Sequence, residues 1–519
     1  MIKTLVSLNS LPASLKKEIP LLGEFETILT KVVPLSVYPD VPASKVMLGL
    51  YYLWQEKKAE QALHKQALAQ MLKTGQVAPG FAPIYQGLSP DRVCEDRARL
   101  SKWLYLSDLA DAVYAAGSAR SMSAKTMLKR ENIILGQWAP VFLGHVWKPV
   151  HLVAVDDYSR SILLIVRGTK SLHDLTTDVG MRARPLTLAH HKTRHGHAPP
   201  SPPSSLQRES DLVKAVVGAA AATEVAVHSG IGDAAELLAL ELKAVLQELI
   251  VRHPGYKVRC VGHSLGGSVA AMVAIILKRE IPEMEAITFA AVPCVSGEVA
   301  DESRDYVTSL VLRDDLFARL SLGSLTRLLL ELRDHEWSDA IMSDLRTDLV
   351  SFIQGLRKNK LFSTALEETR FVNKLGSWLN VDELVTLGAP GATPETPEGK
   401  RAGRVKKDLD KAYSAFVLDS KEHVELYSPG TLYHIVERDE LGLMPGQPPV
   451  STTENPASSV AGSLLQGRNV EQMASQDRFC VVRSSKEHFL RVELTETMIS
   501  DHKNENYTWA LREALKRLY

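Results

Sequence analysis

The sequence predicts an α/β fold, a mostly parallel sheet flanked by helices, with an N-terminal helical region and a helical insertion. Three observations support this prediction. Short apolar segments alternate with helical segments from about residue 150 onward. One of these segments, 258–261, runs into a Gly-rich turn and then an Ala-rich helix. Two long stretches show helical spacing of apolar residues without strand alternation.

These patterns divide the chain into four regions. Apolar residues at three- and four-residue spacing over 59–74 and 97–116 make the first region helical. The expected regions are a helical N-terminal region over 1–125, the first part of the α/β core over 126–320 with a candidate lid at 181–226, a helical insertion with a disordered tip over 321–420, and the second part of the core over 421–519.

The core should contain a series of strands and two long helices. A long helix is expected over 233–252, and a terminal helix should end at Tyr519. The expected strands are 151–156, 161–166, 286–291, 306–312, 431–437, 477–482 and a last strand near 489–494.

The sequence Gly262-His263-Ser264-Leu265-Gly266 has the G-x-S-x-G pattern of a nucleophile elbow, in which a strand-to-helix corner exposes a serine hydroxyl. The turn is so tight that the positions flanking the serine must be small, which explains the two glycines. The alternative is a plain Gly-rich turn between a strand and a helix. The apolar strand before the motif and the buried helix after it favour Ser264 as a nucleophile.

A serine becomes reactive when a histidine takes its proton and a carboxylate orients that histidine. In the α/β-hydrolase fold, the chain order is serine, acid, histidine, and the acid follows a strand beyond the elbow. Asp314 and Asp315 both follow the strand expected over 306–312, so both qualify by position. We favour Asp315 over Asp314; in the alternative, both carboxylates simply end a strand in solvent.

The histidine should lie after the last strand and before the terminal helix. His434 falls within a predicted strand, and His488 opens the last one. Only His502 occupies the expected loop. Although a lone loop histidine is usually a solvated side chain, this position predicts His502 as the base.

Two backbone donors are needed for the oxyanion that develops on the substrate. The elbow supplies the N–H of Leu265. The second donor should follow an earlier strand, and Arg167-Gly168-Thr169 is well placed, because glycine allows close approach and threonine offers an N–H and a hydroxyl. The alternative for this segment is an ordinary turn at a strand end.

Four segments together resemble class 3 (fungal-type) lipases, and within that family the sn-1-specific diacylglycerol lipases. They are 165–178, similar to R-G-T-x-S-x-x-D-x-x-T-D; 227–230, similar to V-H-x-G; 310–319, similar to V-L-x-x-D-L-V-P-R; and 498–502, similar to M-L-x-D/E-H. The resemblance implies that Thr169 supplies an oxyanion donor. Its register selects Asp315 instead of Asp314 and assigns the base to His502.

The resemblance implies a serine-dependent lipid ester hydrolase that forms an acyl-enzyme with a Ser-His-Asp triad and needs no metal or organic cofactor. The expected substrate is an acylglycerol or a related lipid, presented at a membrane or a lipid-droplet surface. Two alternatives are open. One keeps the triad in a phospholipase, galactolipase or acyl transferase, and the other is an inactive hydrolase fold that serves as an interaction protein.

The amino-acid composition limits the kinds of partner and the cellular location that we expect for this protein. Lys plus Arg and Asp plus Glu both number 61, which argues against a nucleic-acid partner. Four scattered cysteines favour a reducing compartment. No apolar stretch reaches the ~18 residues of a membrane span, so we expect a cytoplasmic protein with at most peripheral membrane contact. A histidine-rich tract could bind a metal but is better explained as a solvated loop; it contains His190, His191, His195 and His197.

Overall fold

A computed structural model describes residues 43–74, 85, 88–143, 146–169, 183–189, 222–321, 323–325, 327–328, 425–441, 478–516 and 518. The chain divides into two compact units. The first contains the greater part of helix α2 (Ala43–Thr74). The second is drawn from residues 66–324, 423–493 and 497–519, and it holds the sheet and the candidate site.

The second unit is built on an eight-stranded sheet in the order β1-β4-β5-β8-β9-β10-β11-β12. The five strands from β5 to β11 run parallel, while β1, β4 and β12 pair antiparallel at the two edges. The strands are β1 (Ile133–Gln137), β4 (His151–Asp156), β5 (Ser161–Val166), β8 (Lys257–His263), β9 (Met284–Phe289), β10 (Val307–Leu312), β11 (Thr431–Glu437) and β12 (Phe479–Ser484).

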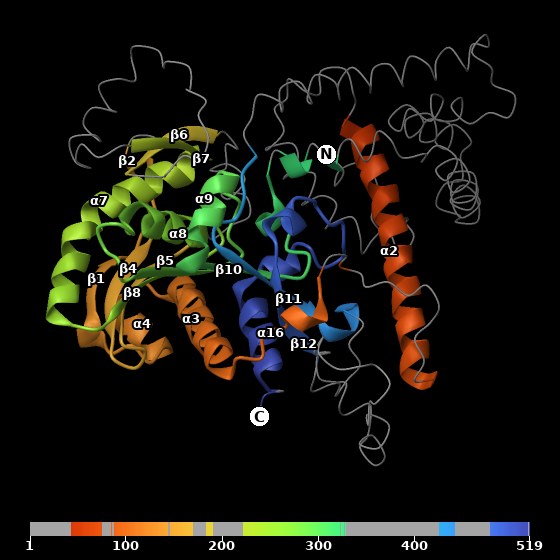
Figure 1. Ribbon diagram of the computed structural model, residues 1–519, viewed down its shortest axis with the longest axis horizontal. Coiled ribbons are helices and arrows are strands. Elements are labelled where there is room, and N and C mark those ends of the chain that lie inside the picture. The colour runs from red at the N-terminus through yellow and green to blue at the C-terminus, as the bar shows by residue number, and fades with distance from the viewer. Residues whose placement is uncertain are drawn as a thin grey trace, which may run out of the picture. The chain divides into compact units, whose positions relative to one another are not determined.

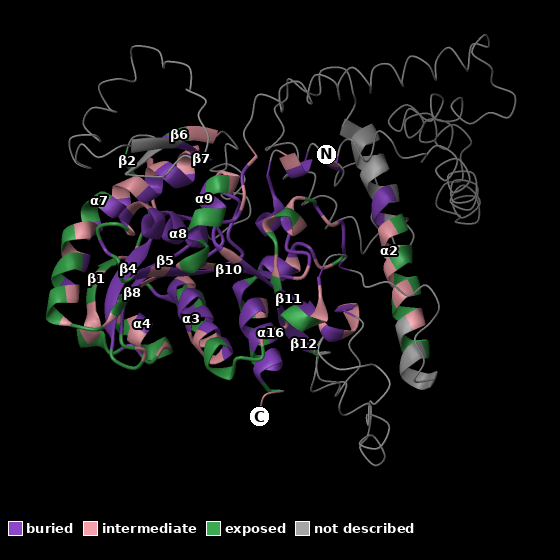
Figure 2. Ribbon diagram, in the orientation of Figure 1, coloured by how far each residue is buried: buried purple, intermediate pink, exposed green. Residues whose placement is uncertain are grey.

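Helices cover both faces of this sheet (Figure 1). One face carries α7 (Ser229–Arg252), α8 (Leu265–Leu277) and α9 (Gly297–Glu302); the other carries α3 (Arg97–Ala115), α4 (Ala119–Lys125) and α16 (Asn504–Lys516). Every residue of β4 and β5 is buried, as expected for strands covered on both sides. Figure 2 shows buried residues along the strands and exposed ones on the outer sides of α7 and α3.

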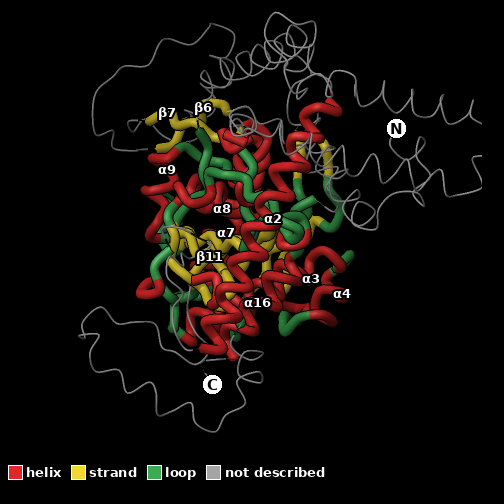
Figure 3. The backbone as a smooth tube through the Cα atoms, turned by 90° about the vertical axis from the view of Figure 1, so that its right-hand side faces the viewer, coloured by secondary structure: helices red, strands yellow, loops and turns green. Residues whose placement is uncertain are grey.

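A separate antiparallel ribbon joins β6 (Ala183–Ala189) to β7 (Ala222–His228). Its base lies past the carboxyl end of β9, because the His228 N–H donates to the Cys294 carbonyl and Val227 bridges Val295. Figures 1 and 3 both place this ribbon at the end of the unit opposite the C-terminus. The ribbon therefore lies at the carboxyl ends of the parallel strands, where β8 ends and the elbow begins.

The structure confirms most of the expected elements. The helix expected over 97–116 is α3, that over 233–252 lies within α7, and the strands expected at 151–156 and 161–166 are β4 and β5. Strand β1 and the hairpin of β2 (Val141–Leu143) and β3 (Val146–Lys148) were not predicted. Their half-exposed residues lack the continuous apolar character of the central strands.

The prediction of a last strand near 489–494 is wrong. Residues Lys486–Phe489 form a short 3-10 helix, and no strand follows it before α16. The backbone is engaged differently here, since the His488 N–H donates to Ser485 and the His488 carbonyl accepts from Arg319. Phe489 and Val492 are buried without strand pairing, which explains the apolar pattern.

Three expected features lie outside the described residues. These are most of the helical insertion with its tip, the apolar middle of the candidate lid, and the histidine-rich tract. The four region boundaries stay predictions. Helix α3, from the region expected at 1–125, packs in the same hydrophobic core as the sheet. Among the described helices, none combines the length and apolar character needed to cross a bilayer.

Candidate active site

Ser264 stands at a sharp corner between β8 and α8. Its φ of 58° and ψ of −136° lie in a region that L residues rarely adopt. The corner is anchored because the Ser264 N–H donates to the Phe289 carbonyl at 2.9 Å, and the Ser264 carbonyl accepts from the N–H groups of Gly267 and Ser268. Strain that is held in place by surrounding hydrogen bonds is typical of functional sites, and here it presents the serine hydroxyl.

The two elbow glycines are required by the closeness of the chain to itself. A Cβ on Gly262 would lie 2.5 Å from the Gly266 carbonyl oxygen. A Cβ on Gly266 would lie 2.5 Å from the Gly168 nitrogen and from the Val166 carbonyl oxygen. The end of β5 therefore approaches the elbow at backbone contact distance, which explains why both positions are glycine.

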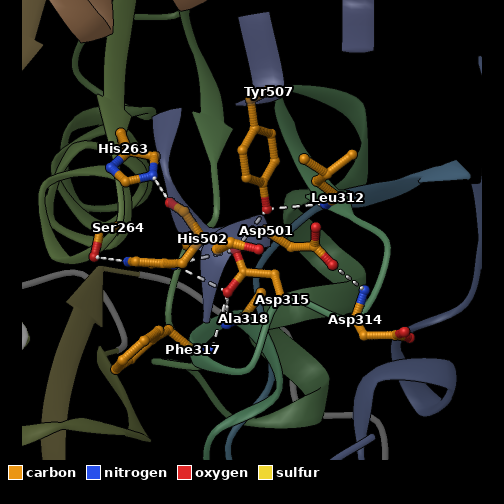
Figure 4. Close-up of polar contacts among 12 residues, drawn as sticks. His263, Ser264, Leu312, Asp314, Asp315, Phe317, Ala318, Asp501, His502 and Tyr507 are labelled. Carbon is orange, nitrogen blue, oxygen red and sulfur yellow. Dashed lines mark hydrogen bonds and ion pairs between the residues drawn. The ribbon is translucent and has the colours of Figure 1, made fainter. Parts of the chain in front are cut away.

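Ser264, His502 and Asp315 form one hydrogen-bonded chain (Figure 4). The Oγ of Ser264 lies 2.8 Å from Nε2 of His502, and Nδ1 of His502 lies 2.9 and 3.1 Å from the two carboxylate oxygens of Asp315. All three residues are buried, and Asp315 is fully so. The three residues singled out from the sequence are thus brought together; that they perform catalysis stays a prediction.

The carboxylate fixes the tautomer of the histidine. Two acceptor oxygens face Nδ1 of His502, so the proton must be on Nδ1, and the lone pair of Nε2 faces the serine hydroxyl. Burial alone would raise the pKa of Asp315, but the charge of His502 and hydrogen bonds from His502 and Tyr507 lower it below its usual value. The carboxylate is therefore ionised and able to stabilise an imidazolium.

Asp315 is also held by the backbone of its own loop. Its Oδ1 accepts from the Phe317 N–H at 2.9 Å and from the Ala318 N–H at 3.4 Å, and these are the first two residues of the short 3-10 helix Phe317–Arg319. Asp314, the alternative acid, points elsewhere. Its Oδ1 accepts from the Tyr85 hydroxyl at 3.1 Å and lies 4.0 Å from the Arg319 guanidinium. The geometry therefore favours Asp315.

The segment expected to stabilise an oxyanion lies beside the elbow. A Cβ on Gly168 would be 3.3 Å from the Cβ of Ser264 and 2.8 Å from the His263 carbonyl. Thr169 directly follows Gly168, and Leu265 is the first residue of α8. Leu265 thus adjoins the nucleophile, and Thr169 follows a residue that approaches it; donation by either to a substrate stays a prediction.

Sequence reasoning missed three residues that surround this chain. The Tyr507 hydroxyl donates to Oδ2 of Asp315 at 2.7 Å. His263 places Nε2 2.7 Å from the His502 carbonyl oxygen, and the Tyr114 hydroxyl lies 3.0 Å from Nδ1 of His263. His263 lies inside the elbow motif, so its position in the sequence was a signal that could have identified it. Tyr114 and Tyr507 have no local signal, since each sits unmarked in a helix.

The other late histidines belong to a different buried cluster. His434 Nε2 lies 2.8 Å from the Arg313 carbonyl oxygen, and His488 Nε2 lies 3.2 Å from His434 Nδ1. Burial is the largest factor that lowers the pKa of both, to about 3 for His488. Neither hydrogen-bonds to Ser264. In the part of the chain that the structure describes, no cluster of His, Cys, Asp or Glu could hold a metal ion.

Three features define the α/β-hydrolase fold. They are a mostly parallel sheet, a strained serine between strand and helix, and a hydrogen-bonded serine, histidine and carboxylate that follow the chain order Ser264, Asp315, His502. Residues 163–324 match the family model for "Lipase (class 3)", so this part of the chain is similar to class 3 lipases. The match runs from β5 past Asp315 and includes the elbow. It does not include His502, Tyr507 or Tyr114.

Curated relatives are diacylglycerol lipases. The chain is 28% identical to diacylglycerol lipase-beta of Mus musculus over 190 residues, which is 36% of this chain and 24% of that protein. It is 27% identical to diacylglycerol lipase-alpha of Homo sapiens over 187 residues, 35% of this chain and 15% of that protein. The chain therefore spans less than a quarter of the length of either relative.

Solved structures of fungal lipases are similar at a low level. Rhizomucor miehei triacylglyceride lipase has 18% identity and a TM-score of 0.31, covering 43% of this chain and 74% of that one. A lipase from Rhizopus microsporus var. chinensis has 14% identity and a TM-score of 0.31, covering 46% and 74%. Values this low carry no inference about substrate or mechanism.

Proposed function

We propose that this chain is a carboxylic ester hydrolase that cleaves acylglycerols, with diacylglycerol as the first candidate substrate. The observation that carries the proposal is the buried chain from Ser264 through His502 to Asp315, within hydrogen-bond distance at each step. The match of residues 163–324 to the class 3 lipase model and the similarity to diacylglycerol lipases support a lipid ester as the substrate class.

The reaction would run through an acyl-enzyme. Nε2 of His502 takes the proton of Ser264 as Oγ attacks the acyl carbonyl, and the resulting imidazolium is stabilised by the Asp315 carboxylate. The N–H of Leu265 and the N–H or hydroxyl of Thr169 hold the oxyanion. His502 then protonates the leaving glyceride oxygen. A water molecule, deprotonated by the same histidine, releases the fatty acid and restores Ser264.

The segment 181–226 is a candidate lid, and the alternative for its apolar part is a helix packed permanently on the core. Its two ends form the ribbon β6–β7, which starts at the sheet edge that carries the elbow. The base of the ribbon is fixed to α7, because Arg184 forms ion pairs with Asp233 at 2.7 Å and Glu236 at 2.5 Å. We propose that the part between the strands meets the lipid surface, at a membrane or a lipid droplet reached from the cytoplasm.

A lipid-release assay with a matched variant tests this function. The purified chain is incubated with emulsions of diacylglycerol, triacylglycerol, phospholipid and galactolipid, and free fatty acid is measured beside Ser264→Ala. We expect release from diacylglycerol that is abolished in the variant, and labelling of wild-type Ser264 by a fluorophosphonate probe. Release only from phospholipid or galactolipid, or transfer to an added alcohol, would redirect the substrate assignment. A wild-type chain that neither labels nor releases fatty acid would contradict the proposal.

A further inference from the structure

A helix outside the family-matched segment delivers a hydroxyl to the elbow. Helix α3 begins at an Asp96 side-chain cap and buries Leu106, Leu109 and Val113 in the main hydrophobic core. The next residue, Tyr114, packs against the same core, and its hydroxyl lies 3.0 Å from Nδ1 of His263. A side chain that precedes the first strand of the sheet in the sequence thus contacts His263, the residue before the nucleophile.

The proton positions along this contact follow from its far end. Nε2 of His263 lies 2.7 Å from the backbone carbonyl oxygen of His502, which can only accept, so Nε2 carries the proton (Figure 4). Burial, with the charge of His502 second, lowers the pKa of His263 to about 3, so the ring is neutral. Its Nδ1 is then a lone-pair acceptor, and the Tyr114 hydroxyl must be the donor.

The oxygen of Tyr114 also lies against Gly168, on the oxyanion side of the site. Burial raises the pKa of the phenol, so the hydroxyl keeps its proton. A Cβ on Gly168 would lie only 2.6 Å from this oxygen. Tyr114 therefore packs against the residue that precedes Thr169, one of the two proposed donors for the oxyanion.

These contacts form one directed chain, from the Tyr114 hydroxyl to His263 and from His263 to the His502 carbonyl, with Gly168 packed against the Tyr114 oxygen. We propose that Tyr114 is a positioning residue that, through His263, sets the backbone of the base His502 and at the same time fixes the strand end before Thr169. The role rests on the proposed hydrolase function. Tyr114 does not touch the reacting atoms, so its effect should fall on turnover more than on substrate binding.

Tyr114→Phe removes only the hydroxyl, and Tyr105→Phe is the matched control. Tyr105 lies on the same helix, and its hydroxyl donates to Asp156 at 3.1 Å, away from the elbow. We expect Tyr114→Phe to lower the rate of Ser264 labelling by a fluorophosphonate and kcat on diacylglycerol by about 10-fold, with little change in KM. Tyr105→Phe should label at the wild-type rate. Thermal unfolding of each variant separates this loss from a loss of fold.

A double-mutant cycle with His263→Phe tests whether Tyr114 acts through His263. If it does, Tyr114→Phe adds little further loss when His263 is already replaced, and His263→Phe alone shows a loss at least as large. Fully additive losses would overturn the relay, and so would Tyr114→Phe that labels as fast as wild type. A wild-type chain that does not label would instead contradict the hydrolase function and the positioning role with it.

Discussion

The hydroxyl of Tyr507 lies 2.7 Å from Oδ2 of Asp315 and accepts a hydrogen bond from the Leu312 N–H at 2.9 Å. Burial, followed by the charge of Asp315, raises the pKa of this phenol well above its usual value, so it remains a donor. The carboxylate is thereby held on one oxygen by Tyr507 and on the other by the N–H groups of Phe317 and Ala318. It is oriented before the substrate arrives.

Tyr507→Phe should therefore lower kcat by about 10-fold and raise the pKa of Asp315, because the carboxylate loses a charge-assisted hydrogen bond. The acid limb of the pH–rate profile should move to higher pH. Tyr256→Phe is a suitable control, since the hydroxyl of Tyr256 donates to Asp157 at an exposed position, 3.0 Å away. An unchanged acid limb would contradict the role given to Tyr507.

The adjacent carboxylates Asp314 and Asp315 offer a test within one dipeptide. Asp315→Asn should lower kcat by about 10³- to 10⁴-fold, because an amide cannot hold the proton on Nδ1 of His502 in the same way. Asp314→Asn should cost less than about 10-fold, since its partners are Tyr85 and Arg319 and not the histidine. Kinetics of the two purified variants on one lipid emulsion compare them. Equal losses would show that the acid is shared or misassigned.

A methyl group at Gly266 should destabilise the fold as well as the site. Its Cβ would meet backbone atoms of Arg167 and Gly168 at 2.5 Å, and backbone atoms cannot move aside as a flexible side chain can. We expect Gly266→Ala to lower the free energy of unfolding by about 1–3 kcal/mol. Gly117→Ala is the control, because a Cβ there meets nothing within 4 Å. Urea unfolding measures both, and similar midpoints would argue against the close approach.

The stability of the unit should depend on pH through Asp501, the neighbour of His502. Burial raises its pKa from 3.8 to about 7, although the Arg313 charge opposes this. Between these values the unfolded chain ionises while the folded carboxyl stays protonated, so the free energy of unfolding falls as pH rises from about 4 to 7 and then levels off. The fall should be on the order of 1–4 kcal/mol.

Asp501→Asn removes this titration and should flatten the stability curve over the same pH window. The measurement is urea unfolding of both proteins at a series of pH values. Glu440, whose pKa burial raises to about 8, titrates in both and leaves a residual slope. An identical slope in the variant would show that Asp501 ionises in the folded protein as it does in the unfolded chain.

The three residues of the proposed triad could be read from the sequence because each obeys a local rule. Ser264 sits in a motif whose glycines are imposed by the turn, Asp315 follows a strand, and His502 precedes the terminal helix. Tyr114 and Tyr507 could not be found this way. Their contacts span 149 and 192 residues, and nothing in either helix marks the tyrosine as different from one that simply packs.

The central strands were predictable for a similar reason. Strands β4 and β5 are buried along their whole length and appear as continuous apolar runs. The hairpin β2–β3 exposes Phe142 and Leu143, so burial leaves no such pattern there. The segment 489–494 shows the converse, since apolar residues are buried there by packing without strand pairing, and periodicity alone does not separate the two cases.

Helices α3 and α16 lie side by side (Figure 1), joined by a bond of 2.7 Å between the hydroxyls of Ser107 and Thr508 and by Asn504, which donates to the Ser107 carbonyl. An excised piece limited to 163–324 would carry the nucleophile and the acid yet leave the base behind. Removing the N-terminal residues that include α3 would take away the contacts that hold α16, and α16 follows His502 directly in the chain. Activity should therefore require both helices, and not only the family-matched residues 163–324.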